Sequence, residues 1–302
     1  MQTVFITGAT GYIGFSVAQA FRRAGYAVLG LTRSPHKARF LAQREIQPVV
    51  GAMQEPDTYR HLAAQADILI HAAVDYQADT AELDRLTVET LLAAARQGTT
   101  PRTLIYTSGV WVHGDTGGDA VDESSPLAPA AAVAWRPAVE DQVLTETGVR
   151  GLVLRPGVVY GGAGGLTGLW FDGATNGHPF DVVGDGRNHW SMVHVGDLAQ
   201  GYVLAAQSGL AGEVFNLVDG VPRQVSEMVT AIGRATGTHK RPHYRPLAEA
   251  VTEMGPLAEA LALDQKLRPD KATRFLGWHP QHPDFVADVH TYYRAWQAQR
   301  QQ

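Results

Sequence analysis

The chain has 302 residues, of which 45% are hydrophobic and 18% charged, and its formal net charge is −5. This composition suits a globular protein with a large core, and the negative charge gives no reason to expect nucleic acid or an anionic membrane as a partner. The absence of cysteine excludes disulfides, thiolate metal sites and a cysteine nucleophile. We see neither a secretion signal nor a run of about 18 apolar residues, and therefore expect a cytoplasmic protein without a membrane span.

Short apolar runs in the first half of the chain have the length and composition of buried strands. The predicted strands cover residues 3–7, 27–31, 48–50, 67–73, 103–107 and 152–154. Amphipathic patterns predict a first helix that starts near Phe15 and ends at Gly25. Further predicted helices cover residues 35–43, 80–96, 225–236 and 246–263.

Strands that alternate with helices predict an α/β fold, a doubly wound parallel sheet of the Rossmann type. Ligands of such sheets lie beyond the carboxyl ends of the strands, so functional residues should directly follow each strand. The alternation of strand and helix patterns ends at a glycine-rich run that begins at Gly161. We expect residues 1–160 to form the Rossmann domain. Residues 161–302 should form mainly a smaller, interleaved C-terminal substrate lobe, with some segments that return to the first domain.

A loop with three glycines joins the first predicted strand to the first predicted helix, in the order Gly8-Ala9-Thr10-Gly11-Tyr12-Ile13-Gly14. Glycines permit a tight turn and a close approach of a diphosphate, which the free N–H groups at the helix start can bind. Because the loop follows an apolar strand and opens a helix, it predicts a dinucleotide site. The alternative interpretation is an ordinary tight turn between strand and helix.

The end of the second predicted strand indicates which dinucleotide is bound. An acidic residue there binds a ribose 2′-hydroxyl, whereas an arginine accommodates a 2′-phosphate. This chain has Arg33 and no acid, with Lys37 a turn later. Because arginine can bind a phosphate through two N–H groups, the sequence favours NADP(H) over NAD(H). A solvated surface arginine is the alternative.

Further motifs follow in a fixed order along almost the whole chain. They are His71-Ala72-Ala73, Tyr106–Gly109, Leu154–Gly161, Val193–Ala199 and Phe215-Asn216-Leu217. Together with the glycine loop they make the chain similar to the extended short-chain dehydrogenase/reductase superfamily, and within it to the NAD-dependent epimerase/dehydratase family.

The resemblance implies a role for several groups of residues. Gly8, Thr10, Gly11, Tyr12 and Ile13 would hold the diphosphate, and Arg33 would meet the 2′-phosphate. Ala72 and Ala73 would lie near the adenine-side ribose, and Thr107, Pro156 and Val158 at the nicotinamide side.

The catalytic set of the resembled family is incomplete in this chain. That set is a Ser or Thr with a Tyr-x-x-x-Lys pair on a helix, but the only lysines here are Lys37, Lys240, Lys266 and Lys271. If Glu140 matches the family's helical glutamate, Arg136 takes the place of the lysine and Ala132 that of the tyrosine. Arginine keeps the positive charge but cannot shuttle protons. Gly109 stands at the usual serine position, and Ser108 one residue before it.

Other polar and aromatic residues are candidates for the missing chemistry. For catalysis we consider His113, Tyr76, Ser108 and Arg136, since histidine titrates near neutral pH; a structural hydrogen bond is the alternative for His113. For substrate contacts we consider Asp75, Tyr160, Trp170 and His189. Asp75 and Tyr76 have a loop-capping alternative, and Tyr160 a structural one.

The histidines are dispersed and lack a His-Glu-x-x-His or similar spacing, so we expect no metal. The leading hypothesis is an atypical NADP(H)-dependent reductase that acts on a small organic carbonyl compound. One alternative is an NADP(H)-binding regulatory or sensor protein, similar to NmrA-like proteins, and another is a sugar-nucleotide epimerase or dehydratase. The expected partner is a small-molecule substrate, with a homodimer left open and no nucleic acid or membrane.

Overall fold

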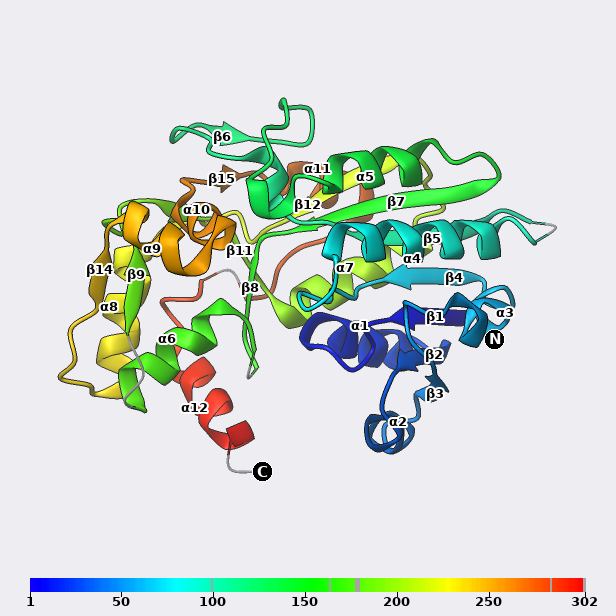
Figure 1. Ribbon diagram of the computed structural model, residues 1–302, viewed down its shortest axis with the longest axis horizontal. Coiled ribbons are helices and arrows are strands. Elements are labelled where there is room, and N and C mark those ends of the chain that lie inside the picture. The colour runs from blue at the N-terminus through cyan, green and yellow to red at the C-terminus, as the bar shows by residue number, and fades with distance from the viewer. Residues whose placement is uncertain (99, 163, 177–179, 283, 301–302) are drawn as a thin grey trace.

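The computed structural model describes residues 1–98, 100–162, 164–176, 180–282 and 284–300. Its centre is a seven-stranded parallel sheet in the order β12-β7-β5-β4-β1-β2-β3 (Figure 1). The strands are β1 (Thr3–Thr7), β2 (Ala27–Thr32), β3 (Gln47–Val50), β4 (Ile68–His71), β5 (Arg102–Thr107), β7 (Val149–Pro156) and β12 (Glu213–Leu217). This arrangement confirms the predicted doubly wound Rossmann fold.

Helices cover both faces of the sheet, and each face has its own apolar core. One core contains residues of α1 (Tyr12–Arg23), α2 (Pro35–Ala42), α7 (Val195–Gln207) and α11 (Asp270–Leu276). The other contains residues of α3 (Arg60–Ala63), α4 (Thr80–Ala95) and α5 (Arg136–Thr145). Because α7, α11 and β12 come late in the chain, the sheet and its covering helices include residues from both halves of the sequence.

A second lobe lies beside the sheet (Figure 1). Its helices are α6 (Leu166–Thr175), α8 (Val225–Thr236), α9 (Leu247–Met254), α10 (Pro256–Ala262) and α12 (Val289–Arg300). Short strand pairs complete it and connect it to the sheet: β8 (Val158–Tyr160) with β11 (Met192–His194), β9 (Asp181–Val183) with β14 (His243–Arg245), β10 (His189–Trp190) with β13 (Arg223–Gln224), and β6 (Ala120–Val121) with β15 (Lys266–Leu267). Single 3-10 turns lie at Pro56–Thr58, Val110–His113 and Ala131–Val133.

The helix predicted over residues 246–263 is in fact two helices, α9 and α10. Gly255 lies between them with a φ of 60°, a conformation that other residues rarely adopt. Pro256 follows as the first residue of α10, where its missing N–H costs no helical hydrogen bond. A Gly-Pro pair therefore divides a segment whose apolar periodicity alone predicts one helix. Among the described residues, no helix is both long and apolar enough to cross a membrane.

Candidate functional site

The register of the parallel strands brings the ends of β1, β4, β5, β7 and β12 to one edge of the sheet. Thr7 is level with His71, and His71 is level with Tyr106. On the other side of β5, Thr107 is level with Leu154, and Leu217 is level with Pro156. Residues that directly follow these strands therefore lie together, which is where ligands of doubly wound sheets bind.

The glycine loop is packed too tightly for other residues. Gly8 has a φ of 75°, and a Cβ added to it would lie 2.4 Å from the carbonyl oxygen of Ala72. A Cβ on Gly14 would lie 2.2 Å from the carbonyl oxygen of Gly8. Helix α1 begins after Gly11 without a side-chain cap, so the N–H groups of its first turn are not claimed by a capping side chain. This cradle fits the diphosphate of a dinucleotide.

A cavity of about 380 Å³ opens beside the glycine loop and reaches the ends of β2 and β4. Every residue that the sequence analysis assigned to the diphosphate or to the adenine-side ribose lines it, namely Gly8, Thr10, Gly11, Tyr12, Ile13, Arg33, Ala72 and Ala73. Lys37 lines the cavity too. The lining also includes residues that no sequence motif marks, because they lie at or just after strand ends: Leu31, Thr32, Gly51, Met53 and Val74. Thr107, Pro156 and Val158 lie outside its lining.

Tyr12 connects the glycine loop to the second lobe. Its hydroxyl donates to the carbonyl of Gly161 at 2.6 Å. Its ring lies against Gly164, where an added Cβ would approach it to 2.2 Å. Burial raises the pKa of the Tyr12 phenol well above its ordinary value, so it remains a hydrogen-bond donor at neutral pH. The glycine-rich segment after β8 thus holds the glycine loop in place. Ala163 of that segment lies outside the described residues.

Arg33 and Asp75 form an ion pair across the cavity, with 2.8 Å between Nη1 and Oδ2. This pair places Asp75 beside the end of β2, close to Arg33. We expected Asp75 among the substrate contacts, because a residue after β4 can point toward the nicotinamide. The neighbouring Tyr76 is 78% exposed and does not line the cavity, so the proton-donor role considered for it finds no support in this geometry.

At the end of β5, three side chains surround Thr107. Arg136 donates from Nη1 to the Thr107 carbonyl at 2.7 Å, and the Thr107 hydroxyl lies 2.6 Å from the hydroxyl of Tyr202. The Ser108 hydroxyl is buried and, like Nε of Arg136, has no hydrogen-bond partner among the described residues. Two polar groups are thus left with hydrogen-bonding capacity next to Thr107.

Arg136 owes its position to the register of α5. One turn further along this helix, the buried carboxylate of Glu140 receives the guanidinium of Arg155 through both oxygens, at 2.5 to 3.2 Å. The same register that pairs Glu140 with β7 directs Arg136 to β5. The assignment of Arg136 to the lysine place stays a prediction.

His113 lies against this ion pair. Its Nε2 is 3.3 Å from Nη1 of Arg155 and 3.3 Å from the side-chain oxygen of Asn216. Burial and the nearby charge of Arg155 lower the pKa of His113 to about 4. The ring is therefore neutral at pH 7 and enclosed, which favours the structural alternative over a catalytic one.

A row of buried hydrogen bonds lies under the strand ends. The Thr7 hydroxyl is 2.6 Å from Nδ1 of His71, and Nε2 of His71 is 2.9 Å from Asp84. Asp84 also accepts from the Tyr106 hydroxyl at 2.5 Å and from the Trp135 indole at 2.9 Å. Burial raises the pKa of Asp84, but the bonds from His71 and Tyr106 outweigh it and hold that pKa below its ordinary value. This carboxylate fixes the ends of β4 and β5 and the start of α5.

Three residues predicted to contact the substrate lie outside the lining of this cavity, and their substrate contacts stay predictions. Tyr160 is fully buried and donates its hydroxyl to the carbonyl of His282. Trp170 stacks on Trp190 with 4.9 Å between ring centroids, inside the core of the second lobe. His189 pairs through Nδ1 with Asp264 at 2.8 Å. None of the three lines the cavity, because aromatic residues in a glycine-rich segment supply the core of the small lobe here.

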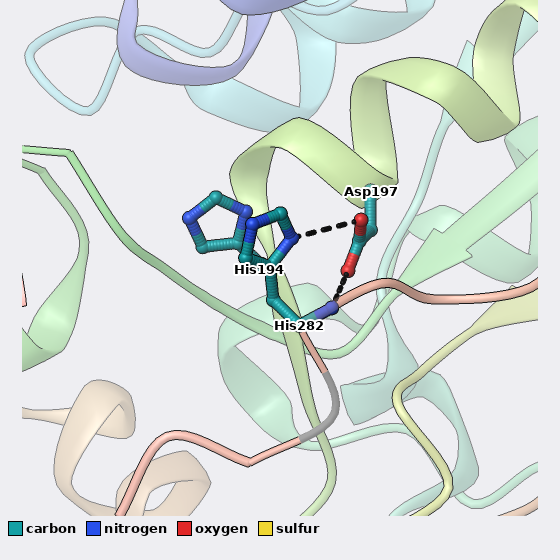
Figure 2. Close-up of side chains that lie close together, drawn as sticks. All are labelled: His194, Asp197 and His282. Atoms are coloured by element: carbon teal, nitrogen blue, oxygen red, sulfur yellow. Dashed lines mark hydrogen bonds and ion pairs between the residues drawn. The ribbon is translucent and has the colours of Figure 1, made fainter. Parts of the chain in front are cut away.

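Figure 2 shows a cluster that the sequence did not reveal, formed by His194, Asp197 and His282. Asp197 accepts from Nδ1 of His282 at 3.1 Å and from its backbone N–H at 2.8 Å, across 85 positions of sequence. Nδ1 of His194 accepts from the backbone of Gly196 at 3.2 Å, and the two imidazole rings stack with centroids 3.9 Å apart.

The ring planes of His194 and His282 are inclined by 30° to one another. Hydrogen bonds already engage both oxygens of Asp197 and Nδ1 of His194. These hydrogen bonds join α7 to the segment before α12. The absence of a metal stays a prediction.

Comparison with known proteins identifies the class. The model of the NAD dependent epimerase/dehydratase family matches residues 4–217. The chain therefore belongs to this family. It is 30% identical over 305 residues to the 4-hydroxy-2-methyl-3-oxo-4-farnesyl-3,4-dihydroquinoline-1-oxide ketoreductase of Stigmatella aurantiaca, with 91% of each chain covered. It is 25% identical to the sterol-4-alpha-carboxylate 3-dehydrogenase, decarboxylating, of Dictyostelium discoideum, over 76% of this chain and 75% of the relative.

Among solved structures, the dTDP-glucose 4,6-dehydratase of Bacillus anthracis in complex with NAD has a TM-score of 0.83. The match covers 100% of this chain and 98% of that one, at 19% sequence identity. Such a likeness shows the shared fold.

Proposed function

We propose that the chain is an NADP(H)-dependent reductase of small organic carbonyl compounds, in which Arg136 and Ser108 take the places of the family's lysine and serine. The cavity beside the glycine loop carries the proposal. It combines a cradle for a diphosphate with Arg33 and Lys37 near the end of β2, where a 2′-phosphate would lie. The ketoreductase and dehydrogenase named among the relatives support oxidoreductase chemistry.

Residues of the cavity and of the neighbouring end of β5 have separate tasks in this proposal. The backbone from Gly8 to Ile13 holds the diphosphate, and the cations of Arg33 and Lys37 bind the 2′-phosphate. Bound NADPH supplies the hydride that reduces the carbonyl carbon. Arg136, held by the Thr107 carbonyl, uses its remaining N–H groups to bind the nicotinamide ribose.

The proton that completes the alcohol needs a separate source. An arginine side chain does not shuttle protons. His113 is enclosed and already neutral at pH 7. The Ser108 hydroxyl, which has no partner among the described residues, donates a hydrogen bond to the carbonyl oxygen. That oxygen then takes a proton from water, which leaves hydroxide. Catalysis in this form consists mainly of orientation and hydrogen bonding.

Two measurements test the proposal. NADPH fluorescence titration should show binding, and a panel of aldehydes and ketones should include one that oxidises NADPH in the presence of the protein. Ser108→Ala should lower that turnover by about tenfold or more and leave NADPH affinity unchanged. Ser208→Ala is the matched control, because Ser208 caps the end of α7. NADPH binding without turnover across the panel would leave the sensor interpretation instead, and absence of binding would overturn both.

A further inference from the structure

The ion pair between Arg33 and Asp75 is asymmetric. The Arg33 side chain is 68% exposed, whereas that of Asp75 is 12% exposed. Both residues line the cavity that we assign to the dinucleotide. The arginine can swing toward a ligand at little cost, because exposed ion pairs contribute little to stability. The carboxylate is enclosed and stays where the loop holds it.

Several bonds fix Asp75 in addition to Arg33. Its Oδ1 accepts from the backbone N–H of Gln77 at 3.0 Å, and the Gln54 side chain also bonds to the carboxylate. Its backbone carbonyl accepts from the Thr80 hydroxyl at 2.9 Å, which ties the loop to the start of α4. The bond from Gln77 and the charge of Arg33 lower the pKa of Asp75, so a negative charge is present in the cavity at neutral pH.

We infer that Asp75 is a specificity-determining residue. It competes with the 2′-phosphate of NADP(H) for Arg33, and so reduces the preference of the chain for NADP(H) over NAD(H). The inference rests on the proposed function. A 2′-phosphate must take Arg33 away from Asp75 and then lie near that carboxylate. A 2′-hydroxyl leaves the ion pair intact and can donate to Asp75. The wild-type chain should therefore bind both cofactors, with NADP(H) ahead by a modest factor.

The physical reason is the balance of charge around one phosphate. Arg33 and Lys37 are the cations among the residues that line the cavity, and Asp75 is the one acid in that set. Neutralising the acid should strengthen binding of the doubly charged phosphate and leave the hydroxyl form nearly unchanged. At a partly exposed site, removal of one like charge should change the affinity for NADPH by roughly threefold to tenfold.

Asp75→Asn is the test variant, because its amide oxygen keeps the bond from Gln77 while the charge disappears. Dissociation constants of NADPH and NADH, measured by fluorescence titration of wild type and variant, give a ratio that needs no substrate. We expect Asp75→Asn to shift this ratio toward NADPH by roughly threefold to tenfold, and the shift to shrink at high salt. An unchanged affinity for NADH shows that the fold and the diphosphate site are intact.

Two further variants separate a specific effect from a general one. Asp79→Asn removes the same charge four residues away and keeps a good N-cap for α4, so it should leave the ratio unchanged. Arg33→Ala should lower the affinity for NADPH. In the Arg33→Ala background, Asp75→Asn should change the NADPH affinity less than it does in wild type. The inference alone is overturned if Asp75→Asn leaves the ratio of the NADPH and NADH dissociation constants unchanged, or if Asp79→Asn shifts that ratio equally. Failure of wild type to bind either nucleotide overturns the proposed function and the inference together.

Discussion

The indole of Trp135 donates to the carboxylate of Asp84 at 2.9 Å, and this bond joins the residue before α5 to the middle of the Rossmann domain. Asp84 receives two further bonds, from His71 and Tyr106. A buried carboxylate on α4 therefore helps to hold the start of α5, in addition to the Glu140–Arg155 ion pair further along that helix.

Asp84→Asn should destabilise the protein, because an amide presents one acceptor oxygen where three donors converge. We expect a loss of about 2–4 kcal/mol in the free energy of unfolding, typical for a buried charged acceptor that loses its bonds. Urea unfolding followed by circular dichroism measures it. Asp57→Asn, on an exposed 3-10 turn, is the control and should stay within about 0.5 kcal/mol of wild type. A similar small effect for Asp84→Asn would contradict the role assigned to this carboxylate.

His113 should make the protein less stable in mild acid. Its pKa is lowered to about 4 in the folded chain, against about 6.5 in the unfolded chain, so the unfolded state binds more protons between these values. Wild type should lose stability relative to His113→Gln as the pH falls from about 6.5 to about 4, by up to about 1.4 kcal/mol per pH unit. Chemical denaturation at several pH values gives the difference curve. His36→Gln, an exposed histidine on α2, controls for the substitution itself. A curve for His113→Gln that is parallel to wild type would show that His113 is not held neutral.

Asp219 should make the protein less stable as the pH rises, whereas His113 makes it less stable as the pH falls. Burial, with a contribution from Asp284, raises its pKa to about 8, so the folded chain keeps a proton that the unfolded chain has released. Wild type should lose stability relative to Asp219→Asn as the pH rises from about 4 to about 8. The amide resembles the protonated acid and still accepts from the N–H of Val221. A stability difference that is constant between pH 4 and pH 8 would refute the protonated state.

Two glycines at the site should respond differently to substitution. At Gly109 the backbone is extended, and an added Cβ meets nothing nearer than the Pro156 carbonyl at 3.9 Å, so Gly109→Ser should fold with a melting temperature close to wild type. Gly8→Ala forces a Cβ to 2.4 Å from the Ala72 carbonyl in a left-handed conformation, and should lose NADPH binding together with several degrees of stability. Thermal unfolding and fluorescence titration check both variants. Equal tolerance at the two positions would contradict the packing described here.

Local patterns predicted the half of the site that depends on consecutive residues. The strand–turn–helix motif predicted a site at the glycine loop, the end of the second strand pointed to Arg33, and the family resemblance added Ala72 and Ala73. All of these residues line the cavity. The Arg33–Asp75 pair could not be predicted, because the two residues lie in loops 42 positions apart. Neither loop has a sequence pattern that indicates contact with the other. The His194–His282 stack is hidden for the same reason.

The second lobe was harder to predict because burial there depends on contacts between short elements. Trp170 follows a run of glycines, a setting that predicted a residue in the wall of the substrate cleft. In the structure it stacks on Trp190 within an aromatic core. Tyr160 ends a short strand and reads as a residue at the cleft, but its hydroxyl is used by the His282 carbonyl. The NADP(H) preference and the replacement of the catalytic lysine by Arg136 stay predictions that the experiments above address.

The way the chain returns to its sheet has a consequence for biosynthesis. The core on the α1 face includes Leu198 and Tyr202 of α7 and closes with Trp278, whose indole donates to the Asp197 carbonyl. A nascent chain that ends at residue 160 lacks the α7 and Trp278 side chains that share a core with Val17 and Phe21 of α1, and its sheet lacks β12, the edge strand beside β7. Such an intermediate presents an apolar surface and an open strand edge, the features that recruit chaperones. We therefore expect the sheet and its α1-face core to complete their folding only after residues 195–278 have been synthesised.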